Sequence, residues 1–292
     1  MRNLLLQGLA AGALAAATFG ASQTPPAAPF PVHQLTPAIY WVEGSRSNSG
    51  VIVGEHGVIV IDTQISPDAG KELLGEIAKI TPKPITTVIL THSDLDHIGG
   101  LPVFPKGITI IAQENCKKEM EAAIASHAAN APSPDSLPTQ LVTRQREDLT
   151  IDSIKLELLH TAPAHTSGDL IIYLPEQKIA FAGDILTMTR ARPLIHAEKG
   201  GSSEGWISMA KALMGLDTDI YVPGHGNAAV TKPVIQKRID DLVAERNQIK
   251  ELIAQGKSLQ EIEEITGDRK PPEEHSPPTS EVIYNELTHK AK

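Results

Sequence analysis

The sequence contains a single cysteine, Cys116, so no disulfide can form within one chain. Aromatic side chains make up only 3% of the 292 residues, which argues against the stacking platforms that single-stranded nucleic acids need. Positive charge is also scarce, because 26 Lys and Arg stand against 35 Asp and Glu and give a formal net charge of −9. A partner with a phosphate backbone would call for clustered Lys and Arg. We therefore expect a small-molecule substrate and no nucleic-acid partner.

The N-terminal residues 1–22 have the pattern of an export signal. Arg2 supplies a charged start, Leu4 to Phe19 form an apolar and Ala-rich run, and small residues follow at a candidate cleavage site. The run is short for a membrane span and leads into Ser-Gln-Thr-Pro-Pro. Removing it deletes the charge of Arg2, so the mature chain would carry −9 − 1 = −10. We expect a periplasmic or secreted protein with no stable membrane anchor after signal removal, and the alternative is an uncleaved N-terminal anchor.

The rest of the chain divides into three parts by composition. Residues 23–36 are a Pro-rich lead-in, residues 37–268 form one domain, and residues 269–292 are a C-terminal tail that follows two adjacent prolines. The sequence leaves the oligomeric state open.

Short strand-like runs alternate with amphipathic helical segments through both halves of the domain. Ser66 is an N-cap ahead of Pro67 at the first helical position, which predicts a helix there. The other expected helices cover residues 113–126, 203–214, 232–254 and 259–265. Strands with inserted helices in two such halves predict an α+β fold with two sheets packed face to face.

Residues 85–100 hold the densest set of candidate metal ligands. Residues 88–90 are an apolar run typical of a buried strand. Four potential ligands follow within six positions: His92, Asp94, Asp96 and His97. Residues two apart at a strand end project to the same side, so the first two can converge on one ion. The last two are adjacent and diverge, which suits a second ion, whereas the alternative is a polar cluster on a solvated loop.

The pattern of strand, turn and ligand recurs three more times. His165 stands in Ala-Pro-Ala-His-Thr-Ser-Gly-Asp, Asp184 in Phe-Ala-Gly-Asp-Ile, and His225 in Val-Pro-Gly-His-Gly. Each lies beside a hydrophobic run and is flanked by Gly, Pro or another small residue. Taken with residues 92–97, these positions predict a metal centre.

The order and spacing of these residues resemble the metallo-β-lactamase superfamily, whose motif His-x-His-x-Asp-His is followed by a separate His, a bridging Asp and a final His. The resemblance covers residues 35 to 230 and implies a four-layer αββα sandwich. It also implies two ligand sets and a bridge between them. One metal would take His92, Asp94 and His165, the other Asp96, His97 and His225, with Asp184 bridging. One position departs from the motif, because Asp94 stands where the family has its second His.

The resemblance implies two divalent metal ions, zinc first, with iron or manganese as alternatives. Two cations about 3.5 to 4 Å apart can share one water and yield hydroxide near neutral pH. Asp184 and Asp96 are the expected catalytic residues, the first as bridge and the second as a ligand that also holds the nucleophile in line. The expected reaction opens an amide, ester, lactone or thioester, with a β-lactam as one candidate. Asp94 adds a negative charge and a hard oxygen donor, so we expect a less electrophilic first metal.

Two other functions stay open. Iron oxygen-reducing members of the superfamily also carry an acidic residue at the position of Asp94, which makes an iron-dependent redox enzyme on the same fold the first alternative. The second is an inactive metal-binding protein that lost its activity through Asp94.

Several residues outside the motifs have two possible roles. Asp62 ends a predicted strand and either orients a metal ligand or closes a turn. Residues 186–206 are either a lid over the site or a solvated loop, and an arginine there, Arg190 or Arg192, would suit a substrate carboxylate. Met188, His196 and Trp206 belong to the same stretch.

The Gly-x-Ser-x-Gly match at residues 201–205 lacks the preceding hydrophobic strand of a nucleophile elbow, so we interpret it as a chance match. Structural or surface roles are expected for Cys116, His56, His127, His160 and His196.

Overall fold

Side-chain alternation along the strands decides which layer of the molecule each residue enters. In β4 (Val58–Ile61) all four residues are buried. Ile59 and Ile61 pack between two sheets, whereas Val58 and Val60 pack against helices on the opposite face. A strand buried on both faces reads as a continuous apolar run, and this one sits where the sheet changes from antiparallel to parallel pairing.

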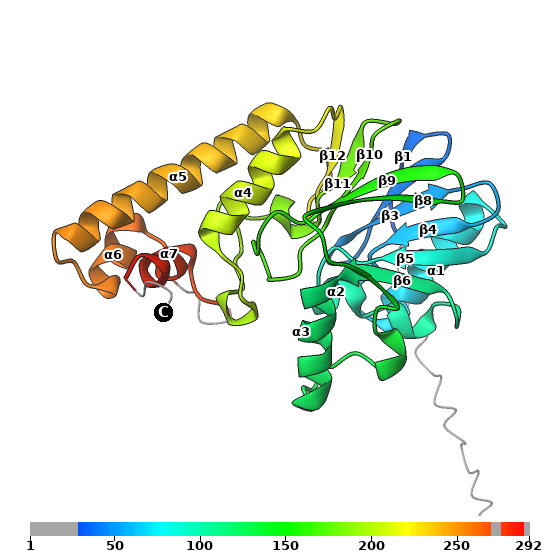
Figure 1. Cartoon of the computed structure of the whole chain (residues 1–292), viewed down its shortest axis with the longest axis horizontal. Helices are drawn as coiled ribbons and strands as arrows, with labels where there is room; N and C mark the ends of the chain where they lie inside the picture. The colour runs from blue at the N-terminus through cyan, green and yellow to red at the C-terminus, as the bar shows by residue number, and fades with distance from the viewer. Residues whose placement is uncertain (1–28, 270–275, 289–292) are drawn as a thin grey trace, which may run out of the picture.

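Two β-sheets lie face to face in the computed structural model, which describes residues 29–269 and 276–288 (Figure 1). The seven-stranded sheet follows chain order: β1 (Val32–Thr36), β2 (Ile39–Glu43), β3 (Asn48–Val53), β4, β5 (Ile85–Ile89), β6 (Thr109–Gln113) and β7 (Gln140–Val142). The five-stranded sheet has the order β12-β11-β10-β9-β8, with bounds β8 (Arg146–Ile151), β9 (Ile154–Leu159), β10 (Ile171–Leu174), β11 (Ile179–Phe181) and β12 (Ile220–Val222). The export signal predicted at residues 1–22 lies outside the described residues.

Helices cover the outer face of each sheet. Along the chain they are α1 (Pro67–Ile80), α2 (Leu95–Ile98), α3 (Glu114–Ala125), α4 (Ser203–Met214), α5 (Lys232–Ala254), α6 (Leu259–Thr266) and α7 (Thr279–Thr288). One apolar cluster joins α1 and α3 to the seven-stranded sheet, and another joins α4, α5 and α7 to the five-stranded sheet. A third fills the space between the sheets. The α+β class and the four-layer αββα sandwich predicted from the sequence are confirmed.

Local signals set most helix boundaries. The Ser66 side chain accepts a hydrogen bond from the Ala69 amide and Pro67 occupies the first turn, so α1 begins where the sequence predicts. Ser258 and Glu261 form the expected capping box of α6. Trp206 is fully buried in α4, in the core and away from any lid.

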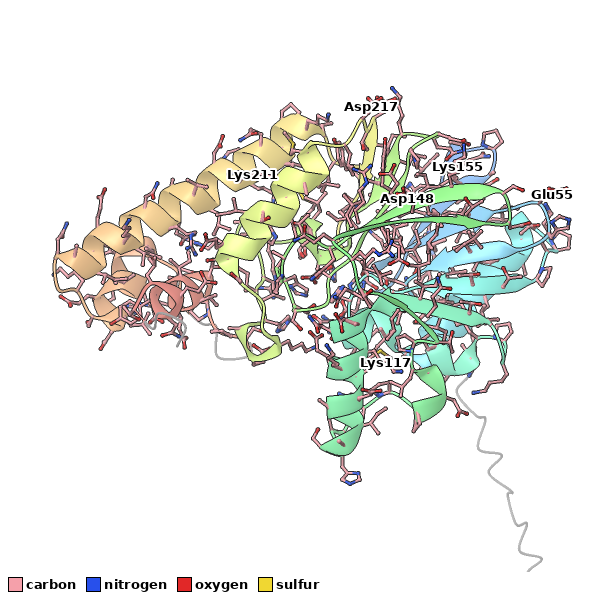
Figure 2. All side chains as sticks on the ribbon, viewed as in Figure 1. Glu55, Lys117, Asp148, Lys155, Lys211 and Asp217 are labelled. Carbon is pink, nitrogen blue, oxygen red and sulfur yellow. The ribbon has the colours of Figure 1, made fainter. Side chains whose placement is uncertain are left out.

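Both ends of the predicted domain carry further structure. Val32–Thr36 of the Pro-rich lead-in form strand β1, which pairs antiparallel with β2. In the predicted tail, α7 packs against α5 through the buried Ile283, and Glu286 forms an ion pair with Arg246. The division into lead-in, domain and tail stays a prediction. Charged side chains such as Glu55, Lys155 and Asp217 lie at the periphery (Figure 2).

No helix among the described residues is long and apolar enough to cross a membrane.

Candidate metal centre

Four strand ends deliver the predicted ligands to one place. Residues 92–97 follow β5 and enter the short helix α2. His165 lies on the loop after β9, and Asp184 lies on a 3-10 turn (Gly183–Leu186) after β11. His225 follows β12 and pairs with Thr187 through an isolated bridge. Because β5 belongs to one sheet and β9, β11 and β12 to the other, the centre straddles the edge where the two sheets meet.

The structure brings all seven predicted ligands together. His92, Asp94 and His165 form one group whose ligand atoms lie within 4.8 Å of one another, and Asp96, His97 and His225 form another. His92, His97 and Asp184 form a third group that overlaps both sets. These groupings match the two ligand sets and the bridge that the resemblance implies.

Asp94 lies among the candidate ligands despite its departure from the motif. Its Oδ2 lies 2.9 Å from His165 Nε2 and 3.6 Å from His92 Nε2. In the second group, His97 Nε2 and His225 Nε2 are 3.4 Å apart, and Asp96 Oδ2 lies 3.3 Å from His225 Nε2. Each group therefore offers two imidazoles and one carboxylate.

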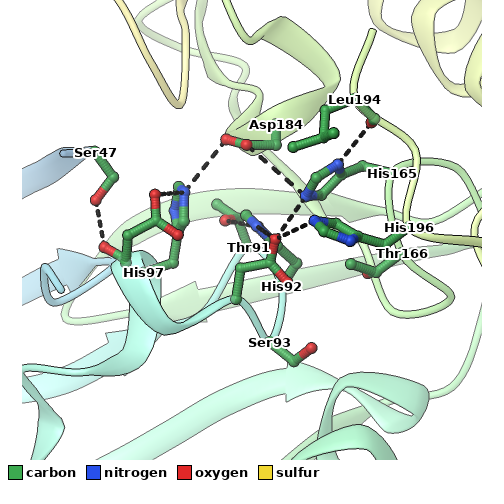
Figure 3. A network of polar contacts seen from close by, with 12 residues as sticks. Ser47, Thr91, His92, Ser93, His97, His165, Thr166, Asp184, Leu194 and His196 are labelled. Carbon is green, nitrogen blue, oxygen red and sulfur yellow. Dashed lines mark hydrogen bonds and ion pairs between the residues drawn. The ribbon is translucent and has the colours of Figure 1, made fainter. Parts of the chain in front are cut away.

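Asp184 lies between the two groups (Figure 3). Its Oδ1 is 3.2 Å from His97 Nε2, and its Oδ2 is 3.1 Å from His225 Nε2 and 3.8 Å from His165 Nε2. The fit around it is close, since a Cβ added at Gly224 would come within 2.2 Å of Asp184 Oδ1. One carboxylate thus faces both ligand sets.

The Nδ1 atoms of three of the four candidate histidine ligands have polar partners, which leaves the Nε2 atoms of these three facing the centre. His165 Nδ1 donates to the Leu194 carbonyl at 2.8 Å, His92 Nδ1 contacts Thr91 Oγ1 at 2.9 Å, and His97 Nδ1 contacts Asp62 Oδ2 at 2.7 Å. Such outer partners fix the tautomer of metal-binding histidines.

Among the candidate ligands, two buried atoms, His92 Nε2 and Asp184 Oδ1, are left without a hydrogen-bond partner. A buried polar atom of this kind is costly unless something binds it. The residues present therefore fit a pair of metal ions.

The contacts of Asp62 fit the orienting role, one of the two that the sequence left open. Its carboxylate accepts hydrogen bonds from the Thr91 amide at 2.8 Å and from Thr91 Oγ1 at 2.7 Å, in addition to the contact with His97. The residue is 1% exposed and has a left-handed φ of 58°. A buried carboxylate thus connects the ligand His97 to the strand end that carries His92.

Opposite charges stabilise each other inside the centre. Burial alone would raise the pKa of Asp94, but His165 together with His196 and His92 outweighs it and holds this pKa well below its usual range. Burial likewise opposes the charge on Asp184, and His97 lowers its pKa well below the ordinary value. For His165, burial lowers the pKa, but the neighbouring Asp94 carboxylate has the opposite effect, and the net result is a pKa raised to about 10.

Zinc binding is expected to release protons and to strengthen as pH rises. A metal ligand must be a neutral imidazole, so the proton that His165 holds below a pKa of about 10 has to leave. In protein stripped by a chelator, zinc affinity should therefore increase with pH up to about 10. Calorimetric titrations in buffers of different ionisation enthalpy would count the released protons. Equal affinities at about pH 6 and about pH 8 would contradict this picture.

Two residues at the centre were not predicted from the sequence as part of it. His196, expected to be structural or on the surface, places its Nε2 3.1 Å from Asp94 Oδ2. Lys199 donates from its ammonium to Asp94 Oδ1. Both belong to the stretch 186–206, and no motif surrounds either one. They come near Asp94 only through folding.

A cavity of about 460 Å³ opens at the centre, and two arginines, Arg46 and Arg190, line it. Its walls include Asp94, Asp96, Asp184 and His225 together with Ser45, Arg46, Thr187, Thr189, Arg190, Leu194 and His196. Arg192 of the same loop turns away and pairs with Glu245 at 2.9 Å. Of the two candidate substrate arginines, Arg190 lines the cavity and Arg192 does not.

The remaining expectations concern residues away from the cavity. Ser203, the central residue of the Gly-x-Ser-x-Gly match, is the first residue of α4, and its hydroxyl contacts Glu286 and Arg246 and not an imidazole. Cys116 is buried in the cluster between α3 and the seven-stranded sheet, and burial raises the pKa of its thiol well above the usual range. Both observations agree with structural roles.

A 2,4-dinitroanisole O-demethylase subunit alpha from Nocardioides sp. (strain JS1661) is 31% identical over 177 residues, covering 60% of this chain and 51% of that protein. A linear primary-alkylsulfatase from Pseudomonas sp. (strain ATCC 19151) is 25% identical over 217 residues, covering 60% of this chain and 40% of that protein. The chain thus spans about half the length of these relatives or less.

A solved metallo-beta-lactamase from Pontibacter korlensis superposes with a TM-score of 0.61 at 20% sequence identity, over 73% of this chain and 98% of that one. At this identity the likeness shows the fold alone. The sequence model of the metallo-beta-lactamase superfamily matches residues 42–225, which is more than half of the chain and runs from β2 to the last ligand, His225. The chain belongs to the metallo-β-lactamase superfamily.

Proposed function

We propose that this protein is an exported, dinuclear metal-dependent hydrolase that cleaves an amide, ester, lactone or thioester of a small molecule. The observation that carries the proposal is Asp184, a buried carboxylate whose two oxygens face the two ligand sets. Imidazole and carboxylate donors suit zinc, with iron or manganese as alternatives. The segment at residues 1–22 supports export to the periplasm or the medium.

When bound, a pair of such ions supplies a hydroxide nucleophile near neutral pH and a Lewis acid for the scissile bond. Asp96 has a side chain that is 23% exposed, more than any other carboxylate of the centre, and it borders the cavity. Its main-chain oxygen accepts a hydrogen bond from Ser47, which fixes the backbone at this point. Asp96 Oδ2 is therefore placed to accept a hydrogen bond from a nucleophilic water and to hold it in line with the substrate.

The cavity favours substrates with an acidic group and an apolar part. Arg46 and Arg190 border it, and arginine binds carboxylates and related anions through two parallel hydrogen bonds. A second cavity of about 520 Å³ shares Ser45, Arg46 and Thr189 with the first. Its other walls include Met188, Val230 and Val234, which would accommodate a hydrocarbon chain.

A sulfate ester is the second candidate substrate. It combines an anionic group for the arginines with an alkyl part for the adjoining cavity, and one relative of this chain is named an alkylsulfatase. A β-lactam with a free carboxylate fits the same arginines, so a panel of lactams, lactones, thioesters and sulfate esters is needed to separate them.

Metal content is the first test. Protein exported and purified without chelators should contain about two zinc ions per chain by elemental analysis. Iron in their place would favour the redox alternative, and a single ion would mean that Asp94 has removed one of the two sites. Two zinc ions without turnover of any substrate in the panel would favour the inactive metal-binding protein.

A further inference from the structure

Asp94 carries one more negative charge than the histidine that the family motif places there, and its two oxygens have different surroundings. Oδ2 faces the imidazoles, at 2.9 Å from His165 Nε2 and 3.1 Å from His196 Nε2. Oδ1 accepts a hydrogen bond from the Lys199 ammonium. One oxygen is thus directed to the candidate metal position and the other to a cation.

Lys199 is held by the same loop that carries His165. The Ser167 amide donates to the Lys199 carbonyl at 3.0 Å, and the Lys199 amide donates to the His196 carbonyl at 2.9 Å. The His196 amide in turn donates to the His165 carbonyl at 2.8 Å. The Lys199 side chain is 31% exposed, so most of it is withdrawn from water. The backbone therefore keeps Lys199 and the ligand His165 in a fixed relation to Asp94.

The nearest further carboxylate has other partners. Glu119 accepts hydrogen bonds from Ser93 Oγ, from the Ser167 amide at 3.1 Å and from Ser167 Oγ at 2.5 Å. Lys199 Nζ lies 3.4 Å from Ser93 Oγ and is closer to Asp94. The ammonium is accordingly paired with Asp94, and the formal charge of the pair is −1 + 1 = 0, the same as that of a neutral imidazole.

We propose that Lys199 is a positioning residue of the first ligand set, which cancels the charge of Asp94 and holds Oδ1 so that Asp94 offers a single oxygen to the metal. The pair Asp94–Lys199 then takes the place of the neutral second histidine of the motif. This inference rests on the proposed metal centre and explains how a carboxylate is accommodated in it. Its corollary is that the family's histidine no longer fits this chain while Lys199 is present.

The test is the zinc affinity of three proteins, measured by competition with a chromophoric chelator. Asp94→His restores the motif but leaves the Lys199 cation facing the metal without its carboxylate. We expect zinc affinity of the first set to fall by about 10- to 100-fold, as when an outer partner of a metal ligand is lost. The double variant Asp94→His/Lys199→Met removes the cation as well and should regain most of that loss.

Two controls isolate the charge of Lys199. Asp94→His/Lys199→Arg keeps a cation at this position and should remain as weak as Asp94→His alone. Asp94→His/Lys211→Met removes a positive charge from the exposed residue Lys211 of α4 and should not restore affinity (Figure 2). Native-like circular dichroism of each variant would show that folding is unchanged.

The inference is overturned if Asp94→His binds zinc as tightly as the native chain, or if removing Lys199 from it restores nothing. Stoichiometry separates this result from the proposed function. A native chain with a single zinc ion would overturn the two-metal hydrolase, whereas the affinity series would still decide the role of Lys199 at the first set.

Discussion

Replacing Asp184 with asparagine is expected to abolish hydrolysis and to lower the metal content. Both oxygens of this carboxylate face ligand nitrogens, one toward His97 and the other toward His225 and His165. An amide presents one weakly basic oxygen and an NH₂ group that repels a cation, so one ligand set loses its shared donor. Several kcal/mol of transition-state stabilisation come from such metals, so we expect kcat/KM to fall by about 10³-fold or more.

Elemental analysis and turnover of the best substrate from the panel would measure both effects. Asp148→Asn is the matched control, because it removes the same charge from an exposed residue of β8 and should leave metal and activity unchanged. His225→Ala removes the ligand that faces Asp184 Oδ2 and should act like Asp184→Asn, with circular dichroism near native in both. Activity that persists in both variants would show that the centre is assigned to the wrong residues.

The sequence locates the candidate ligands because each depends on a local pattern of strand, tight turn and polar residue. Strand ends in a layered fold meet at common edges, so the family resemblance needed only the order of these patterns to bring His92, Asp184 and His225 to one centre. The long helix over residues 232–254 and the capped helices are likewise set by local periodicity and end signals.

The pairing of Asp94 with Lys199 depends on chain segments far apart and could not be predicted in this way. Lys199 is 105 residues from Asp94, and no family pattern links the two, whereas the resemblance already placed Asp94 and His165 in one ligand set. The turn that carries Lys199 (Ala197–Lys199) has no motif, and its position is fixed by backbone hydrogen bonds to the loop of His165. Trp206 belonged both to the predicted helix over residues 203–214 and to the candidate lid, and the packing of α4 buries it completely in the core.

The sequence left the role of Asp62 open. The hydrogen bonds of this residue predict that Asp62→Asn weakens zinc binding. In Asp62→Asn, the amide oxygen can still accept from the Thr91 amide, which places the NH₂ group where Oδ2 contacts His97 Nδ1. His97 Nδ1 must then accept a hydrogen bond, so its proton moves to Nε2, the atom that faces Asp184 and His225. A protonated Nε2 cannot bind a metal, and we expect zinc affinity of the second set to fall by about 10- to 100-fold.

Asp152→Asn provides a closely matched control for this prediction. Asp152 also has a left-handed φ, 49° against 58° for Asp62, and its carboxylate also contacts a histidine Nδ1, that of His56 at 2.8 Å. Asparagine tolerates this backbone conformation at both positions. His56 is exposed and belongs to neither candidate ligand set, so Asp152→Asn should leave zinc affinity unchanged. Because both substitutions preserve shape and remove one charge, a loss confined to Asp62→Asn would assign the effect to the tautomer of His97. Equal affinities in the two variants would instead make Asp62 a structural carboxylate of the strand end.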